Sequence, residues 1–436
     1  MGGGLLQLVA YGAQDIYLTG NPQITFFKVV YRRHTNFSIE CKEQVFNGEI
    51  KFGGTIDCNI DRSGDLLSNM YLEMELPTLK SDTDVNQTAN LKYVNGVGHA
   101  IIKDIQVQIG GQLIDKHYAE WLNIWGELNI ENSRLFGYKE MIGYYDTEIE
   151  GKALSQASSL SINEYRRFYV PLIFWFNRNP GLALPLIALQ YHEVRFVVNL
   201  RKLNEIVVNS GGSADEILPN SKILDTEGNT PEIKSMKLLV DYIYLDTDER
   251  RRFAQVSHEY LIEQLQFTGG ESISEKNTGI INPINLNHPI KDMHWIISRD
   301  VNTAQNTLTG NNVFNYRPST YTDESVVKDV FTTGKLMFNG HDRFPVRNAD
   351  YFRLVQPFQH YPRTHNNFIY SYAFGLRPSE HQPSGTCNFS RVDSATLNLT
   401  FDGTLQSEGD RKIKVYATNY NVLRIMSGMA GLAYSN

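Results

Sequence analysis

Cysteine is scarce in this 436-residue chain, with three residues, Cys41, Cys58 and Cys387, spread widely along it. An odd and scattered set excludes a disulfide framework, and its spacing fits no zinc site. We therefore expect buried free thiols in a protein made in the reducing cytosol.

Long apolar runs are also missing. No stretch approaches the roughly 18 apolar residues that a membrane span requires, and the two longest clusters are interrupted by Pro171 and Pro185. The first residues show no basic segment followed by an apolar one, so we expect no secretory signal. Leu6 stands where a myristoylation motif requires Ser or Thr, so we expect no lipid at Gly2.

Basic charge is in deficit. The chain has 41 Lys and Arg against 48 Asp and Glu, for a formal net charge of −7. Proteins that bind along DNA gain most of their affinity by neutralising phosphates, so we expect no direct nucleic-acid partner. The 20% charged and 41% hydrophobic residues are typical of a folded protein rather than a disordered one.

Signatures of enzymes are absent as well. His192 and Glu193 lack the second histidine of a zinc protease motif, and Gly334-Lys335 lacks the preceding glycine of a phosphate-binding loop. No Gly-x-Ser-x-Gly sequence occurs. We predict no catalytic, cofactor-binding or metal-binding residue, hence no cofactor and no enzymatic activity.

The pattern that is present has a period of two. Apolar and polar residues alternate at 56–60, 105–109, 194–200, 395–401 and 413–417, and Gly110-Gly111 follows the second of these as a hairpin-type turn. Alternation places one face of each segment in a core, so the chain is predicted to be all-β, built from sandwiches. One short helix is expected over 115–128, and the 50 aromatic residues are expected mainly in the core.

An internal repeat supports two similar halves. Residues 105–111 resemble 336–340, 194–200 resemble 395–401, and 240–245 resemble 413–417, always in the same order. A duplicated sandwich with unequal loops would give this arrangement, and the length also suggests about two domains. We expect a solvated connector around 246–253 and long polar loops at 81–90, 204–234, 269–285 and 299–329.

Five sequence blocks carry a family resemblance. They are residues 1–37, 168–174 (FYVPLIF), 179–193 (NPGLALPLIALQYHE), 382–391 (QPSGTCNFSR) and 419–434 (NYNVLRIMSGMAGLAY). These blocks resemble major capsid proteins of large nucleocytoplasmic DNA viruses, the chlorella-virus type most closely. They lie at the start, middle and end of the chain, and the total length fits the shorter members.

The resemblance implies a double jelly roll, two eight-stranded antiparallel β-sandwiches with short helices in loops. Its divisions would be an N-terminal arm at 1–25, a first jelly roll at 26–245, a linker at 246–257 and a second jelly roll at 258–436. The implied function is structural: homotrimeric, pseudo-hexagonal capsomers that tile the icosahedral shell of a large double-stranded DNA virus. Neighbouring capsomers and minor capsid and penton proteins are the implied partners. The implied location is the outer capsid of the virion, after late synthesis in the host cytoplasm.

The N-terminal arm is the predicted assembly segment. It is rich in apolar residues among glycines, which cannot bury one another: Leu5, Leu8, Tyr11, Ile16 and Tyr17. We expect it to lie under the capsomer against neighbours, minor capsid proteins or the inner viral membrane. The alternative is an added edge strand of the first jelly roll, whose first strand is expected near 26–27.

Four Asn-x-Ser/Thr sequences are candidate glycosylation sites, at Asn36, Asn86, Asn388 and Asn398. Capsid proteins of this type carry sugars outside that motif, so the motif is a weak guide. Two alternatives to a major capsid protein stay open. One is a carbohydrate-binding or carbohydrate-active β-sandwich protein, which would show aromatic platforms and, in a hydrolase, a carboxylate pair. The other is a penton-type capsid protein with one jelly roll.

Overall fold

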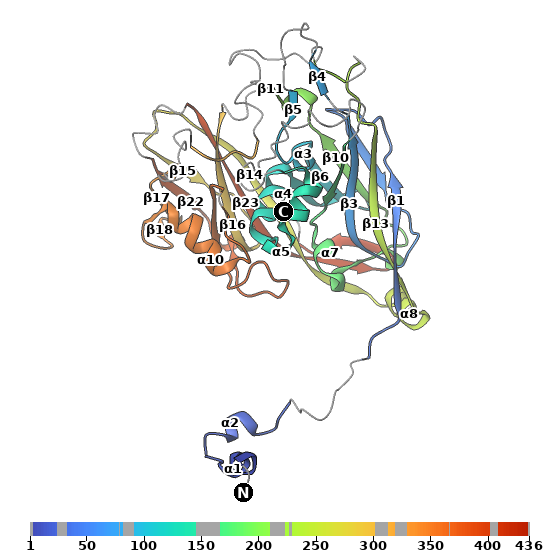
Figure 1. Cartoon of the computed structure of the whole chain (residues 1–436), viewed down its shortest axis with the longest axis vertical. Coiled ribbons are helices and arrows are strands. Elements are labelled where there is room, and N and C mark those ends of the chain that lie inside the picture. Colours follow the sequence, from blue (N-terminus) through green and yellow to red (C-terminus); the bar gives the residue numbers. More distant parts are fainter. Residues whose placement is uncertain are drawn as a thin grey trace. The chain divides into compact units, whose positions relative to one another are not determined.

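The computed structural model describes residues 3–23, 33–77, 79–81, 91–144, 166–209, 223–225, 229–300, 313–318, 329–365, 367–401 and 409–434, shown in Figure 1. They fall into two units, 1–37 and 38–436. The small unit has two short helices, α1 (Gly3–Val9) and α2 (Ile16–Thr19). Asp15 accepts a hydrogen bond from the Gly12 N–H (2.7 Å) and so shapes the turn between them. Residues 3–23 contain no strand, so the edge-strand alternative is wrong for them; residues 26–27 lie outside the described residues.

The first half of the large unit has two main antiparallel sheets. Their strand orders are β1-β13-β3-β8 and β2-β10-β6-β7. The bounds of the first are β1 Phe37–Val45, β13 Ser235–Leu245, β3 Leu66–Leu76 and β8 Arg166–Pro171. Those of the second are β2 Thr55–Asn59, β10 Val194–Leu200, β6 Ile102–Ile109 and β7 Gln112–Tyr118. β9 (Leu184–Pro185) joins β3, and two small sheets pair β4 (Leu79–Ser81) with β12 (Ile223–Asp225) and β5 (Leu91–Tyr93) with β11 (Val207–Asn209).

The second half repeats this arrangement. Its sheets have the orders β14-β23-β16-β20 and β15-β22-β17-β18. The first contains β14 His258–Ile273, β23 Arg411–Met426, β16 Pro289–Arg299 and β20 Ile369–Ala373. The second contains β15 Gly279–Pro283, β22 Ala395–Thr400, β17 Thr333–Phe338 and β18 His341–Asp342. The short strands β19 (Arg347–Asn348), β21 (Cys387–Asn388) and β24 (Met429–Leu432) extend these sheets.

Both halves are jelly rolls with one topology. When the eight main strands of each half are counted in chain order, both halves give the same two sheets, 1-8-3-6 and 2-7-4-5. The predicted double jelly roll is therefore confirmed. The repeat seen in the sequence is also confirmed, because β6 and β17, β10 and β22, and β13 and β23 occupy equivalent positions.

The hairpin turns of the two halves match as well. Gly110 and Gly111 have φ of 58° and 81°, and Asn339 and Gly340 have φ of 50° and 81°. Positive φ at both central residues defines the type I′ turn, whose twist suits a tight hairpin and which favours Gly and Asn. The predicted turn at Gly110-Gly111 is confirmed, and Asn339-Gly340 repeats it between β17 and β18.

Helices occupy the connections. Beside α4 (Ala119–Asn129), α5 (Asn132–Ile142) and α8 (Thr247–Gln255), shorter segments are α3 Val97–Ala100, α7 Trp175–Arg178, η6 Tyr351–Val355, α10 Gln356–His360, η2 Pro180–Leu182, η3 Leu186–Ala188, η4 Leu203–Glu205 and η7 Phe389–Arg391. The helix expected at 115–128 begins later, at 119, because 115–118 complete β7. The solvated connector is the exposed helix α8, in which Arg250 Nε pairs with Asp65 Oδ1 at 3.0 Å.

Two further expectations need correction. Residues 269–285 are largely strand rather than loop, because β14 continues past an irregularity at Phe267/Gly270 and pairs with β23 as far as Ile273. The other long loops lie mainly outside the described residues. The three cysteines are free, but only Cys58 is buried; Cys387 is half-buried, and Cys41 is exposed on the edge strand β1. Burial raises the pKa of Cys58 to about 11, so this thiol is a protonated core residue.

Aromatic side chains fill the core, as expected. Trp175, Trp295 and ten Tyr or Phe side chains are the largest that are fully buried. In the second jelly roll, Trp295 packs edge-on against Phe352 (5.1 Å between ring centroids) and stacks on Tyr370 (6.0 Å). Such ring pairs add about 0.5–1.5 kcal/mol beyond the burial of their area.

Candidate functional site

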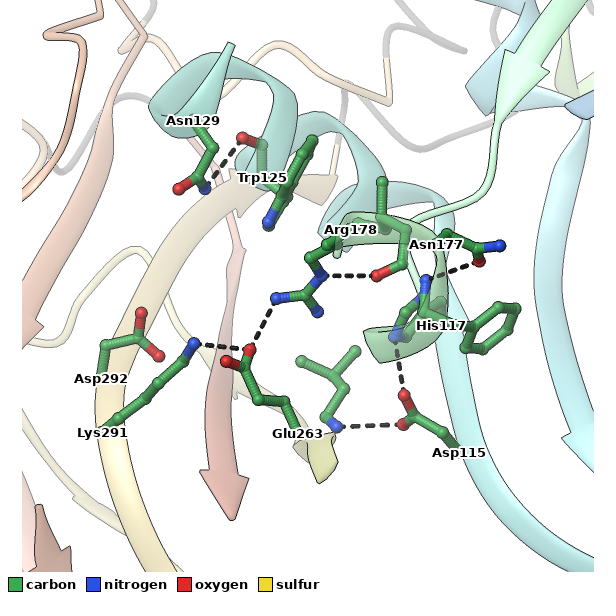
Figure 2. Close-up of polar contacts among 12 residues, drawn as sticks. Asp115, His117, Trp125, Asn129, Asn177, Arg178, Glu263, Lys291 and Asp292 are labelled. Carbon is green, nitrogen blue, oxygen red and sulfur yellow. Dashed lines mark hydrogen bonds and ion pairs between the residues drawn. The ribbon is translucent and has the colours of Figure 1, made fainter. Parts of the chain in front are cut away.

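The contact between the two jelly rolls contains a buried group of charges. Figure 2 shows its centre, Glu263 on β14. The Glu263 carboxylate receives Arg178 Nη1 from α7 of the first jelly roll and Lys291 Nζ from β16 of the second, both at 2.6 Å. All three side chains are buried or nearly so. One carboxylate therefore joins cations from the two halves.

Aromatic rings complete this cluster. The Arg178 guanidinium lies 5.8 Å from the Trp125 ring centroid, and the Lys291 ammonium lies 5.8 Å from the Tyr420 ring centroid. Arg178 Nε also donates to the Ile173 carbonyl at 2.7 Å. The Glu263 carboxylate, the Trp125 ring and the Ile173 carbonyl thus hold Arg178 in one orientation. A buried ion pair needs such fixed geometry if the attraction between its charges is to offset the cost of desolvating them.

Asp292, next to Lys291, is ionised deep in the same interface. Burial alone would raise the pKa of its carboxyl, but the hydrogen bond and charge of His294 and the charge of Lys291 outweigh it and lower the pKa to about 2. Tyr361 donates to Asp292 Oδ2 at 3.0 Å. The Trp121 ring from α4 lies 5.7 Å from the His294 ring, so the first jelly roll covers this group.

A second polar contact lies at the end of β7. Asp115 Oδ1 accepts the backbone N–H of Leu265 on β14 at 3.0 Å, and Asp115 Oδ2 lies 2.9 Å from His117 Nε2. His117 stacks on Phe174 with 4.3 Å between centroids. Gln264 Nε2 donates to the Ile114 carbonyl. The polar side of β7 is therefore buried against β14.

The helix α4 supplies a third contact. Glu120 pairs with Lys414 Nζ on β23 (2.8 Å) and with Arg201 Nη2 (3.4 Å). Burial would raise the pKa of Glu120, but the charges of Lys414 and Arg201 outweigh it and lower the pKa. Glu127, about two turns further along α4, pairs with Arg363. Three carboxylates, Glu120, Glu127 and Glu263, thus each bind a cation across the joint.

Aromatic stacking fills the space between these ion pairs. Phe267 on β14 lies 4.9 Å from Tyr118 and 4.8 Å from Tyr416, measured between ring centroids. Trp121 stacks on Tyr416 at 6.3 Å. The face of β14-β23-β16 that points away from its own core is thus covered by the end of β7 and by α4.

The C-terminal hairpin β23-β24 is hydrogen-bonded to the first jelly roll. The backbone N–H of Tyr191 donates to the Gly428 carbonyl at 3.0 Å, and the Ala430 N–H donates to His192 Nδ1 at 3.1 Å. His192 is therefore a structural residue at the joint. Within the described residues, no three His, Cys, Asp or Glu side chains gather as a metal site would require.

The predicted arm residues are all exposed. Their side chains range from 56% exposed at Leu5 to 88% at Tyr17, with Leu8, Tyr11 and Ile16 between. In helix α1, Leu5 and Leu8 are three residues apart and share a face, a pattern that favours docking on another surface. None of the helices in the described part of the chain is long and apolar enough to cross a membrane.

The candidate glycosylation sites differ in access. Asn36 is exposed, and Asn388 is exposed while its side chain accepts the Ser390 N–H at 3.0 Å. Asn398 lies within β22 and points its Nδ2 at Met337 Sδ, so its amide is engaged in the sheet. Asn86 lies outside the described residues.

Sequence reasoning missed the charged cluster. Glu263, Arg178 and Lys291 are far apart in the chain and carry no motif, and only the way the halves pack brings them together. The one available signal was the set of charged residues inside strands, such as Lys291 and Asp292 on β16. Such residues would be costly to bury unless paired.

Two family matches divide the chain. Residues 25–246 match the family described as "Major capsid protein N-terminus", and residues 249–431 match "Large eukaryotic DNA virus major capsid protein". The major capsid protein of Pyramimonas orientalis virus is 47% identical over 459 residues, and that of Paramecium bursaria Chlorella virus 1 is 41% identical over 474. Both alignments cover all of this chain and all of the relative.

Solved structures agree with this. A chain of the "PBCV-1 virus capsid, quasi-atomic model" superposes with a TM-score of 0.73 at 36% identity, covering 94% of this chain and 100% of that one. The "Faustovirus major capsid protein" gives a TM-score of 0.75 at 14% identity over 95% and 94% of the two chains, a likeness of fold alone. The relatives are named for a structural role, which leaves the sugar-active and single-jelly-roll alternatives without support.

Proposed function

The chain belongs to the family of large eukaryotic DNA virus major capsid proteins, and from that premise we propose that three copies form a pseudo-hexagonal capsomer that tiles an icosahedral shell. The observation that carries the proposal is the repeated strand order 1-8-3-6 and 2-7-4-5 in both halves. Three chains then supply six nearly equivalent blocks around a threefold axis. Such an outline tiles flat facets while the symmetry of the closed trimer stays threefold.

The firm contact between the jelly rolls supports this role. A capsomer must behave as a rigid block, and buried ion pairs with stacked rings join the halves through Glu263, Glu120 and Phe267. A buried charge that loses its partner is strongly destabilising, so relative movement of the halves is costly. The virion capsid is the site of action, and synthesis in the host cytoplasm is part of the proposal.

The oligomeric state tests the proposal directly. Size-exclusion chromatography with light scattering should give a species of three times the 49.7 kDa chain mass that persists on dilution. Electron microscopy of concentrated protein should then show hexagonal arrays. A folded monomer at all concentrations would refute the trimeric building block.

The arm is proposed to act after the trimer has formed. Its exposed apolar residues would dock on neighbouring capsomers, minor capsid or penton proteins, or the inner viral membrane. A Leu8→Ser/Tyr17→Ser variant should still form trimers but fail to enter shells in infected cells, while Gln7→Ala, at an exposed polar position of the same arm, should enter normally. Loss of the trimer itself would place the arm within the capsomer instead.

Sugar attachment at the sequence motif is a separate part of the proposal. Exposure favours Asn36 and Asn388 over Asn398, whose amide contacts Met337. Mass spectrometry of peptides from virion protein would locate the sugars. Modification of Asn398 alone would contradict this order.

A further inference from the structure

The contact between the jelly rolls is made by two unlike surfaces. The first jelly roll contributes the end of β7 and the following helix α4, and the second contributes the outward face of β14-β23-β16. Trp121 on α4 is only 2% exposed because it lies on Tyr416 and His294. In Figure 1, α4 accordingly lies between the sheets of the two halves.

Because the halves have one topology, each of these surfaces exists a second time in the chain. In the second jelly roll, η6 and α10 follow β18 and β19, just as α4 follows β7 in the first. In the first jelly roll, β1-β13-β3 hold the sheet positions 1-8-3 that β14-β23-β16 hold in the second. Figure 1 shows α10 and β1 on opposite sides of the large unit.

The second helical surface is apolar and exposed. We call Val346, Leu354, Phe358 and Leu376 the outer helix surface; their side chains are 56%, 44%, 79% and 73% exposed. Leu354 and Phe358 are four residues apart and share a helix face. His360 Nδ1 lies 2.9 Å from the Leu376 carbonyl, which holds the loop with Leu376 beside α10. Large apolar side chains left exposed on neighbouring segments mark an interaction surface.

The second sheet surface is its counterpart. We call Ile39, Tyr71, Tyr169 and Leu239 the outer sheet surface. Leu239 and Tyr71 are direct cross-strand partners and half-buried, whereas their neighbours Leu238, Val240 and Leu72 face the core. Ile39 on the edge strand β1 is 59% exposed. The outward side of this sheet therefore has an apolar centre.

Most charges around that centre are paired within the chain, whereas the Asp241 carboxylate beside Tyr71 interacts with the Cys41 thiol. Lys237 pairs with Glu43 at 2.7 Å, and Arg167 lies 3.6 Å from Glu73 and 3.9 Å from Glu75. An apolar partner can therefore approach the part of this face around Lys237 and Arg167 without leaving those charges unpaired beneath it. The helix surface, whose four defining residues are all aliphatic or aromatic, has that character.

We propose that the outer helix surface of one copy packs on the outer sheet surface of a second copy, repeating between chains the contact that α4 makes within the chain. The inference rests on the proposed capsomer and names its interface. The two surfaces differ, so the contact is head-to-tail, and such contacts make a ring when the rotation closes. Each copy in the ring uses both surfaces once.

Single substitutions on the two surfaces test the interface. Phe358→Asp and Ile39→Asp should each raise the concentration at which half of the trimer dissociates by about 100-fold, the loss expected when a charge replaces an apolar anchor in an interface. Phe136→Asp is the matched control, because Phe136 on α5 is 63% exposed and belongs to neither surface. Thermal unfolding monitors the fold, and Phe358→Ser replaces the aspartate variant if that one unfolds.

Mixing the two variants gives the sharper test. Each alone should be a monomer, but the intact sheet surface of Phe358→Asp can bind the intact helix surface of Ile39→Asp. At a concentration where wild type is a trimer and each variant alone is dissociated, the mixture should therefore contain a species of twice the chain mass that neither variant gives alone, and no closed trimer. Variants that remain trimers like wild type would overturn this inference and leave the capsomer intact. A monomeric wild-type protein would instead overturn the capsomer proposal.

Discussion

Removing the negative charge of Glu263 should loosen the joint between the jelly rolls. Glu263→Gln keeps the size of the side chain but leaves Arg178 and Lys291, both 2.6 Å away, without their counter-charge. Breaking a buried pair in this way costs about 3–5 kcal/mol. In a unit of this size, each kcal/mol lowers the melting temperature by roughly 2 °C, so we expect a decrease of about 6–10 °C.

A neighbouring ion pair gives the control. Glu259 lies on the same strand and pairs with Arg424 on β23 at 2.8 Å, but both side chains are more than half exposed. Exposed pairs contribute about 1 kcal/mol or less, so Glu259→Gln should shift the melting temperature by about 2 °C at most.

Differential scanning calorimetry on the two variants and wild type would measure these shifts. A triple variant with Met at 178, 263 and 291 should recover most of the loss, because an apolar cluster needs no counter-charge. If Glu263→Gln melted within about 2 °C of Glu259→Gln, the reasoning that this buried cluster joins the halves would be wrong.

Three further predictions concern pH and backbone conformation. The pKa of Asp292 is lowered to about 2, so this carboxyl stabilises the fold above pH ~4 and loses that contribution as the pH falls toward 2. In Asp292→Asn, the free energy of unfolding should therefore depend less steeply on pH between ~4 and 2. Burial lowers the pKa of His99 to about 3, so between pH ~6.5 and 3 the unfolded chain binds a proton that the folded chain does not. The free energy of unfolding therefore decreases as the pH falls through that range, and urea unfolding of His99→Gln should show a smaller decrease. Gly340→Ala should lower the free energy of unfolding by about 1 kcal/mol because of its positive φ alone. Gly110→Ala should lower it clearly more, because the added Cβ would lie 2.5 Å from His192 Nδ1. Equal losses of stability in thermal unfolding would contradict this.

Strands with one face in a core were predictable from the sequence. In β10, Val194, Phe196 and Val198 are buried and alternate with the less buried Arg195 and Asn199, and the strand has the predicted bounds. The same pattern made the repeat visible, because β22 alternates in the same way at the equivalent place. Local sequence is enough to predict a strand when one of its faces packs into the core of its own sandwich and the other faces solvent.

Prediction failed where a strand has no solvent side. On β7, Asp115 and His117 are almost completely buried, yet their polar side chains indicate exposure, and the sequence predicts a helix from residue 115. On β16, Lys291 and Asp292 are buried by the packing of one half on the other. Such residues are explained only by partners brought from distant parts of the chain, which no local pattern reveals.

The short helix α8 has a consequence for the strength of the joint. It connects β13, the last strand of the first jelly roll, directly to β14, the first strand of the second. Two domains tethered so closely meet at an effective concentration that is millimolar or higher and does not change on dilution. Docking of the two halves is therefore insensitive to how much protein the cell has made, and only contacts between separate chains depend on its accumulation.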